Sequence, residues 1–408
     1  MSFKDKELSK VSQNENDILH TLRLSYDHLP SHLKQCFAYC SVFPKDYKIN
    51  KEILIQQWMA QGFIMVDENE CLEDVGHEYF MNLFWRSFVQ EVEEDEWGNI
   101  NFKVHDLMHD LATSVAELGN KTCCINGESV TEKTHHVSFS INLSFSSQIL
   151  NSLSKACRMR TLLLPNQPSW ISRQIVWERS TCDAFVSSFK FLRLLDLNNT
   201  EIGSVPCSIG KLKHLRFLDL SDNGIKMLPN SITRLQNLRT LKLSWCHILK
   251  ELLRDFYTLV NLRHLVINSC DDLSHMPRGL EKVTNLQILS KFVLSKKTGS
   301  VSGLTRVLKE LHGLRGDLRI SNLRHGKNGA LESNILKEKH LQNLTLDWLE
   351  EGVDEADVVY DEMSLEALQP HPNLKVLTIY NYGGVRFPSW LPSLTNLVRL
   401  KLSHQKKL

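Results

Sequence analysis

Two patterns predict an α+β fold for this chain, with a winged-helix domain followed by an α/β solenoid of leucine-rich repeats. The first is a change of hydrophobic period, because residues 18–59 carry apolar side chains at helical spacing whereas residues 100–104 alternate as a strand does. The second is a tandem repeat that begins at Leu192. At 408 residues, the chain is long enough for several domains.

The tandem repeat decides the architecture of the second half. Each regular unit reads L-x-x-L-x-L/I and then has Thr, Asn or Cys, which is the signature of leucine-rich repeats. The leucines point inward from a short strand, and the small polar side chain can bond the exposed backbone at the turn. One unit cannot bury its apolar face alone, so stacked units share one core. The units begin at Leu192, Leu215, Leu238, Leu262 and Leu286, in steps of 23 or 24 residues.

Less regular units flank this array. An insert at residues 165–188 precedes it, and the register blurs after Phe292. Further strands are expected near Val137, Leu162, Leu318, Leu341, Leu374 and Leu397. We expect about nine or ten repeats. No polar cap follows the last strand, so the array is expected to be incomplete at its C-terminus.

The first 120 residues are predicted to form helices followed by a hairpin. Helices are expected at Ile18–Leu29, Ser31–Cys40, Ile53–Met59 and the first part of Tyr79–Val89. Gly62 ends the third helix. Two extended runs, Phe88–Val92 and Ile100–Val104, then pair as a hairpin.

A winged helix suggests DNA binding, but the charge of the hairpin argues against it. Five acidic residues would lie where phosphates must approach: Glu91, Glu93, Glu94, Asp95 and Glu96. The whole chain carries 48 Lys and Arg against 47 Asp and Glu, a net charge of +1, so it has no bulk attraction to nucleic acid or anionic membrane. We therefore expect no nucleic-acid partner.

Three motifs carry a family resemblance that covers essentially the whole chain. They are LRLSYDHLPSHLKQCFAYCSVFPKDYKI at residues 22–49, LIQQWMAQGFI at 54–64 and VHDLMHDLA at 104–112. In this order, ahead of leucine-rich repeats, they resemble plant intracellular immune receptors of the nucleotide-binding leucine-rich-repeat class (NB-ARC-LRR disease resistance proteins). The similarity is greatest to the coiled-coil subgroup.

The resemblance implies a nucleotide sensor in the third motif. In that family the triplet Met-His-Asp closes a switch, so His109 would contact the β-phosphate of bound ADP and Asp110 would be its packing partner. An imidazole N–H can donate to phosphate, and a carboxylate can orient the ring. From spacing alone, the two residues lie on the polar flank of a helix whose apolar face includes Leu107, Leu111 and Val115.

The resemblance also implies a domain plan and a missing part. Residues 1–16 would be a remnant of the nucleotide-binding region, 17–118 a winged-helix (ARC2-like) domain, 119–190 a linker with early irregular repeats, and 191–408 the leucine-rich repeats. No G-x-x-x-x-G-K-[ST] loop occurs, so nothing here cradles phosphates. We therefore expect a receptor truncated before its nucleotide-binding core, without a cofactor of its own. ADP or ATP is implied for a full-length parent alone.

Cysteine usage and hydropathy predict a reduced compartment and no membrane span. Ten cysteines include no CxxC pair; Cys36 and Cys40 share a helix face and are expected to be buried apolar side chains rather than metal ligands. The N-terminus has no secretory signal, and no apolar run reaches the length of a span. The expected location is the cytoplasm, with the nucleus and the membrane surface as further options. No nucleophile–base set or metal cluster suggests an enzyme.

The repeats carry the candidate recognition residues. Their second positions should stack as a basic column on the exposed strand face: Arg193, Arg216, Arg239 and Arg263, with Trp245 beside them. Arg and Trp are frequent in binding hot spots. A solvated ladder with partial Arg–Asp pairing is the alternative. The resemblance implies a pathogen effector or a guarded host protein as partner. A stand-alone decoy or regulator that pairs with an intact receptor is the alternative function.

Overall fold

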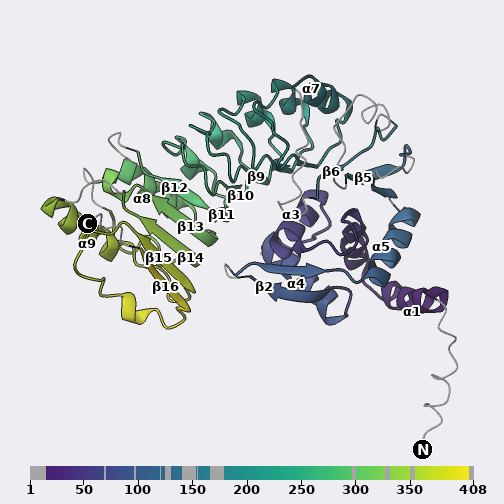
Figure 1. The fold of residues 1–408 in the computed structure, drawn as a ribbon, viewed down its shortest axis with the longest axis horizontal. Coiled ribbons are helices and arrows are strands. Elements are labelled where there is room, and N and C mark those ends of the chain that lie inside the picture. Colours follow the sequence, from purple (N-terminus) through teal and green to yellow (C-terminus); the bar gives the residue numbers. More distant parts are fainter. Residues whose placement is uncertain are drawn as a thin grey trace, which may run out of the picture. The chain divides into compact units, whose positions relative to one another are not determined.

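The computed structural model describes two compact units (Figure 1). The first unit comprises residues 1–173 and 191–195, and the second comprises 174–190 and 196–408. The expected boundaries at residues 118 and 190 differ from this division, because the early repeat strands pack in the same unit as the helices before them. The described residues are 15–68, 70–95, 98–119, 121–124, 130–139, 153, 155–165, 179–295, 300–326, 331–349 and 354–403. Most of the predicted 1–16 remnant therefore lies outside them.

The winged-helix fold is confirmed in the first unit. Its helices are α1 (Glu15–Asp27), α2 (Ser31–Tyr39), η3 (Cys40–Val42), α3 (Lys51–Gln61), α4 (Leu72–Trp85) and α5 (Asp106–Gly119). Its sheet has the order β1-β3-β2, with strands β1 (Ile49–Asn50), β2 (Gln90–Glu94) and β3 (Ile100–Lys103). Both pairings are antiparallel, so the expected hairpin forms between β2 and β3.

Local sequence signals fix the ends of α3. The Asn50 side chain caps its start by accepting from the Ile53 N–H at 3.1 Å. Gly62 ends it with φ at 77°, a left-handed conformation that favours glycine. Trp58, in the middle of α3, is fully buried. The hairpin joins this core through Phe102, whose ring lies 5.0 Å from that of Phe80.

Early repeat strands complete the first unit. They are β4 (Lys121–Cys124), β5 (Thr134–Ser138) and β6 (Thr161–Leu163), all in parallel pairing. Thr161 and Leu162 of β6 then pair with Leu194 and Leu195, the first residues of β7 (Leu194–Asp196). The strands expected near Val137 and Leu162 are therefore confirmed.

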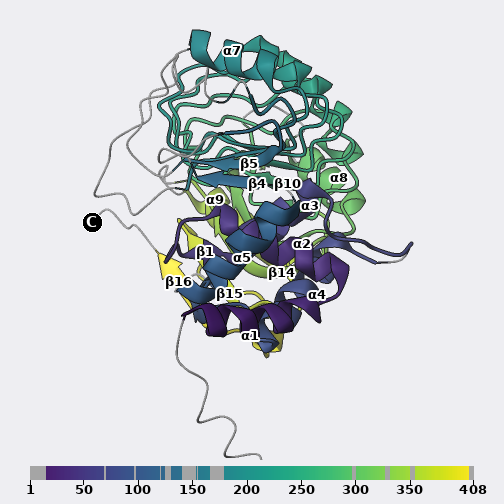
Figure 2. The same ribbon diagram turned by 90° about the vertical axis from the view of Figure 1, so that its right-hand side faces the viewer.

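In the second unit, parallel strands line one side of the solenoid and short helices the other (Figure 2). The strands are β8 (Phe217–Asp219), β9 (Thr240–Lys242), β10 (His264–Val266) and β11 (Ile288–Leu289). The return legs are the 3-10 helices η4 (Cys207–Lys211), η5 (Asn230–Arg234), η6 (Phe256–Thr258) and η7 (Leu280–Lys282), with α7 (Arg179–Ser188) before the first. Repeated leucines such as Leu218, Leu241 and Leu265 are fully buried between the two sides.

The Asn or Cys residue at the turn of a repeat forms hydrogen bonds with backbone groups that lack a partner in the strand, as predicted. Asn223 Oδ1 accepts from the Ile202 N–H at 2.9 Å, and its Nδ2 donates to the Leu197 carbonyl at 2.8 Å. The next repeats use thiols, because Cys246 donates to the Leu220 carbonyl and Cys270 to the Leu243 carbonyl. Burial raises the pKa of Cys246 to about 12 and that of Cys270 to about 11.

A second parallel sheet follows where the register blurs in the sequence. Its strands are β12 (Lys291–Val293), β13 (Arg315–Ser321), β14 (His340–Asp347), β15 (Val376–Tyr380) and β16 (Arg399–Ser403). The strands expected near Leu318, Leu341, Leu374 and Leu397 are thus confirmed. Two helices on the return legs are longer than the earlier 3-10 helices and are not predicted from the sequence: α8 (Ser300–Glu310) and α9 (Glu355–Ala367). The short η8 (Leu323–Gly326) follows β13.

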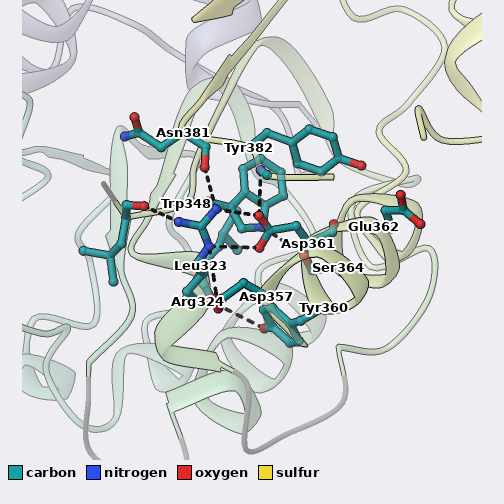
Figure 3. A network of polar contacts seen from close by, with 12 residues as sticks. Leu323, Arg324, Trp348, Asp357, Tyr360, Asp361, Glu362, Ser364, Asn381 and Tyr382 are labelled. Carbon is teal, nitrogen blue, oxygen red and sulfur yellow. Dashed lines mark hydrogen bonds and ion pairs between the residues drawn. The ribbon is translucent and has the colours of Figure 1, made fainter. Parts of the chain in front are cut away.

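Arg324 of η8 is the centre of a buried polar network in these later repeats (Figure 3). Its Nη2 donates to Asp361 Oδ2 at 2.7 Å and its Nε to Asp361 Oδ1 at 3.2 Å. Its remaining donors reach the carbonyls of Leu349 and Asn381, and the Gly383 N–H donates to Asp361 Oδ2 at 2.8 Å. The network therefore ties α9 to the turns that follow β13, β14 and β15. A buried charge pair is tolerated when it is this fully hydrogen-bonded.

We expect Asp361→Asn to destabilise the chain by about 3 kcal/mol, because it removes the nearer of the two carboxylates that pair with a buried guanidinium and leaves only Asp357, at 3.9 Å. Urea unfolding followed by circular dichroism measures the change. The matched control is Glu332→Gln, which breaks an exposed ion pair with Lys309 (2.6 Å) and should cost about 1 kcal/mol or less. Equal unfolding midpoints for the two variants would show that the network does not stabilise the fold.

Candidate functional site

His109 lies in the first turns of α5, and its ring is held by the backbone of a preceding turn. Its Nε2 is 2.7 Å from the Phe43 carbonyl oxygen. That oxygen can only accept, so Nε2 carries a proton and donates. The other ring nitrogen, Nδ1, is buried and has no hydrogen-bond partner among the residues that the structure describes. The ring therefore fastens α5 to the turn after η3.

Asp110, the next residue, forms an ion pair with the same turn. Its Oδ1 lies 2.5 Å from Lys45 Nζ, and the two side chains are 42% and 47% exposed. An ion pair this exposed contributes about 0–1 kcal/mol. The His-Asp dipeptide thus reaches one turn through two adjacent contacts, a part-buried hydrogen bond from His109 and an accessible ion pair from Asp110.

The ADP contact implied for His109 does not fit this arrangement of the ring. With Nε2 donating to the Phe43 carbonyl, Nδ1 is the ring nitrogen left for a phosphate oxygen, and it has no solvent access. The phosphate role of His109 stays a prediction.

Arg193 is engaged inside the first unit. Its Nη1 donates to the carbonyl of Gln61 at the C-terminal end of α3. Gln61 Nε2 donates to the Thr161 hydroxyl at 2.8 Å, and that hydroxyl lies 2.9 Å from His136 Nδ1. Burial lowers the pKa of His136 to about 3, so its ring is neutral there. These contacts join the winged helix to the early repeats.

The other three arginines lie in register on neighbouring strands, as the repeat predicts. The Arg239 N–H donates to the Arg216 carbonyl, and the Arg263 N–H to the Arg239 carbonyl, each at 2.8 Å. All three are half-buried. Burial and the adjacent Arg239 guanidinium lower the pKa of Arg216.

The strand face beside this column is more buried than the sequence suggests. Phe217, Thr240 and His264, in matching positions of β8, β9 and β10, are each at most 1% exposed. Asp219 is 3% exposed and pairs with Lys242 at 2.9 Å. This part of the strand face is therefore less open than expected. Whether the arginine column is a recognition surface or a solvated ladder with partial Arg–Asp pairing stays a prediction.

Trp245 lies in the turn after β9 and not on the strand. It is 56% exposed, has φ at 61°, and packs edge-to-face on His247 with ring centroids 5.7 Å apart. His247 in turn lies 2.6 Å from Asp271. Trp245 therefore belongs to a polar, exposed turn cluster.

An accessible aromatic and cationic face lies instead on the second sheet. The Tyr380 ring has the Arg319 guanidinium at 5.5 Å and the Lys401 ammonium at 5.7 Å from its centroid. Arg319 also pairs with Asp347 at 2.6 Å while staying 45% exposed. The partly exposed Thr378 lies between these side chains on the same face. We call Arg319, Asp347, Thr378, Tyr380 and Lys401 the Tyr380 face.

The buried Arg324–Asp361 network (Figure 3) is linked to this face through Asn381. Arg324 holds the carbonyl of Asn381, and the Asn381 side chain donates to Asp347 Oδ1 at 3.0 Å. Asp347 then orients Arg319 over Tyr380. This face is not predicted from the sequence, because the repeat register blurs there. The alternation of Leu377 and Ile379 with Thr378 and Tyr380 was the available signal.

Cysteines and metal ligands do not form a further site in the described part of the chain. Cys36 and Cys40 are both buried, and the Cys40 thiol donates to the Cys36 carbonyl. Burial raises the pKa of Cys40 to about 12. No group of three or more His, Cys, Asp or Glu residues that could hold a metal occurs among the residues searched. None of the described helices is long and apolar enough to cross a membrane.

Two carboxylates on neighbouring strands predict a pH effect on stability. Burial, and then the nearby Asp219 carboxylate, raise the pKa of Asp196 well above its usual range. A carboxyl group whose pKa is raised in the folded state stabilises the fold while it stays protonated. That stabilisation is fully present when the pH is below the ordinary carboxyl pKa, and it is lost as the pH rises through the raised value. The Asn side chain of Asp196→Asn cannot ionise. The free energy of unfolding of this variant, relative to that of the unchanged protein, should therefore rise by at least about 1 kcal/mol from pH 5 to pH 9.

Urea unfolding at both pH values measures this gain. The matched control is Asp222→Asn, which changes an exposed carboxylate in the following turn and should shift stability equally at the two pH values. An Asp196→Asn protein with the same pH dependence as the unchanged protein would contradict the electrostatic interpretation.

Comparisons with known proteins agree with both halves of the chain. The family described as "Disease resistance protein Winged helix domain" matches residues 42–112, and "Leucine-rich repeat region" matches residues 172–407. The putative disease resistance protein RGA4 of Solanum bulbocastanum is 42% identical over 390 residues, which is 95% of this chain and 35% of that protein. Disease resistance protein RGA2 of the same species is 36% identical over 407 residues, which is 98% of this chain and 38% of that protein.

A relative from another plant extends the agreement. The putative disease resistance RPP13-like protein 1 of Arabidopsis thaliana is 32% identical over 405 residues, covering 95% of this chain and 37% of that protein. The chain thus spans 35% to 38% of the length of these three relatives. With a disease-resistance winged helix, a leucine-rich-repeat region and relatives that align along nearly all of its residues, the chain belongs to the plant nucleotide-binding leucine-rich-repeat disease resistance proteins.

Proposed function

We propose that this chain is the recognition and restraint portion of an intracellular plant immune receptor. In this proposal the repeats bind a pathogen effector or a guarded host protein in the cytoplasm. The winged helix, through Asp110 and Lys45, helps to hold the receptor inactive until that partner binds. Bound ADP would supply the inactive state of a nucleotide switch in the intact receptor. The chain itself acts by binding rather than by catalysis.

The observation that carries the recognition part is the Tyr380 face. Aromatic and arginine side chains dominate binding hot spots, and here they are both accessible and held in place. The Tyr380 ring contacts two cations, the Arg319 guanidinium and the Lys401 ammonium, and Arg319 is held by its ion pair with Asp347. A partner therefore meets a side-chain arrangement that loses little conformational freedom on binding. The half-buried Arg216, Arg239 and Arg263 remain secondary candidates.

A partner selected with the whole chain from effector and host libraries should bind the Tyr380→Ala variant at least about 30-fold more weakly, since hot spots contribute about 2 kcal/mol or more. Surface plasmon resonance of the purified pair measures the change. Tyr257→Ala is the matched control, because Tyr257 also lies under a cation, Lys282 at 5.1 Å, but on a return leg. Equal losses in both variants, or none in either, would reject the Tyr380 face as the recognition surface.

The restraint part can be tested in a full-length receptor in which this chain follows the N-terminal part of RGA4. We expect Asp110→Val and Lys45→Glu each to cause cell death without a pathogen, because both remove the 2.5 Å ion pair between α5 and its neighbouring turn. Ion leakage from leaves that express the receptor measures cell death.

The matched control for the restraint is Lys48→Glu. Lys48 forms an equally short and exposed ion pair, 2.6 Å from Glu93, but to strand β2 of the hairpin. It should leave the receptor silent. If the Asp110→Val and Lys45→Glu receptors accumulate to normal levels and stay silent as well, the ion pair has no part in restraint.

A further inference from the structure

A cavity of about 530 Å³ lies between α7 and the first return leg of the second unit, and lysines dominate its lining. It is lined by Val186, Ser187, Lys190, Lys211 and Lys213. Helix α7 lies on the outer side of the repeats, away from strand β9 (Figure 1). The cavity is therefore separate from the strand faces that carry the recognition residues.

The walls of the cavity are fixed by packing. The Ser208 hydroxyl of η4 donates to the Asp183 carboxylate of α7, which fastens the two elements to each other. Val186 and Phe189 anchor the end of α7 with at most 1% of their surface exposed. Gly210 lets η4 lie against the next repeat, since a Cβ there would be 2.6 Å from the Ser231 carbonyl oxygen. Lys211 follows directly and is thereby held at the rim.

The positive charge of the cavity is not neutralised by the described residues. None of its three ammonium groups pairs with a carboxylate in that part of the chain; Lys213 Nζ reaches only the Arg234 carbonyl, at 3.4 Å. Asp183, on α7 itself, accepts a hydrogen bond from Ser208 and is a single carboxylate against three ammonium groups. The whole chain has a net charge of only +1, so three lysines around one cavity are a local concentration of charge. Like charges in one place repel, and an anion relieves that repulsion.

We propose that this cavity binds a small anion with two or more phosphate groups, such as a phosphorylated inositol. Lysine ammonium groups bind phosphate as point charges, and the Ser187 hydroxyl can donate to a phosphate oxygen. The volume lies in the range of small-molecule sites, about 300–1,000 Å³. One phosphate carries at most about two negative charges, which is fewer than three lysines can neutralise. The site is independent of the protein-recognition function proposed above.

The test is isothermal titration of the whole chain with inositol hexakisphosphate, with unphosphorylated inositol as the negative ligand. We expect binding, and loss of affinity by about tenfold or more for each lysine replaced in Lys190→Gln, Lys211→Gln and Lys213→Gln. The matched control replaces three exposed lysines outside the cavity, Lys226→Gln, Lys250→Gln and Lys337→Gln, with the same change in net charge. The variant that combines the three cavity substitutions is compared with this control. If that triple variant fails to fold, the three single variants still test the proposal.

Vesicles of phosphatidylcholine with and without phosphatidylinositol bisphosphate distinguish the two sources of phosphate. Co-sedimentation with the phosphorylated vesicles, lost in the cavity variant, would identify a lipid headgroup as the ligand. Binding of the soluble polyphosphate without co-sedimentation would identify a free metabolite. The proposal is overturned if the unchanged chain binds neither probe, or if the cavity variant and the control variant bind equally well.

Discussion

The structure depends on one constraint: a single repeat cannot bury its own leucines, and its turn leaves backbone groups that need partners. Asn223 meets the second need by bonding the backbone of its own repeat and of the one before it. Cys246 and Cys270 each donate to a carbonyl of the previous repeat. Because all three side chains reach into the previous repeat, the strands are brought into register, and the positions of surface side chains follow.

That register explains why the two strand faces of the second unit differ. In β8 to β10, residues such as Phe217 and His264 are buried, so little of the face is accessible. In β13 to β16 the row that matches the buried Asp219 and its partner Lys242 holds Arg319, Thr378 and Lys401, which stay at least partly exposed. A buried charge pair outside the repeat pattern, Arg324 with Asp361, orders the turns behind this second face.

The repeat units and the winged helix could be predicted from local signals, because leucine spacing, the Asn50 cap and Gly62 act within one element. The motif residues His109 and Asp110 could be named, but their contacts with Phe43 and Lys45 could not. Those contacts join segments 65 or more residues apart, and no periodicity encodes them. The contact between Arg324 and Asp361 could not be predicted for the same reason. Nor could the lysine-lined cavity, which brings together α7 and a return leg of the repeats.

The thiols at the repeat turns also determine how the solenoid meets oxidants. Only the thiolate form of cysteine reacts readily with peroxides or disulfides. With a pKa of about 12 for Cys246 and about 11 for Cys270, roughly one molecule in ten thousand or fewer carries either thiolate at pH 7. Both sulfurs are also fully buried. An oxidative burst would therefore leave these turns chemically unchanged, and the repeats would keep their register in a cell that is producing peroxide.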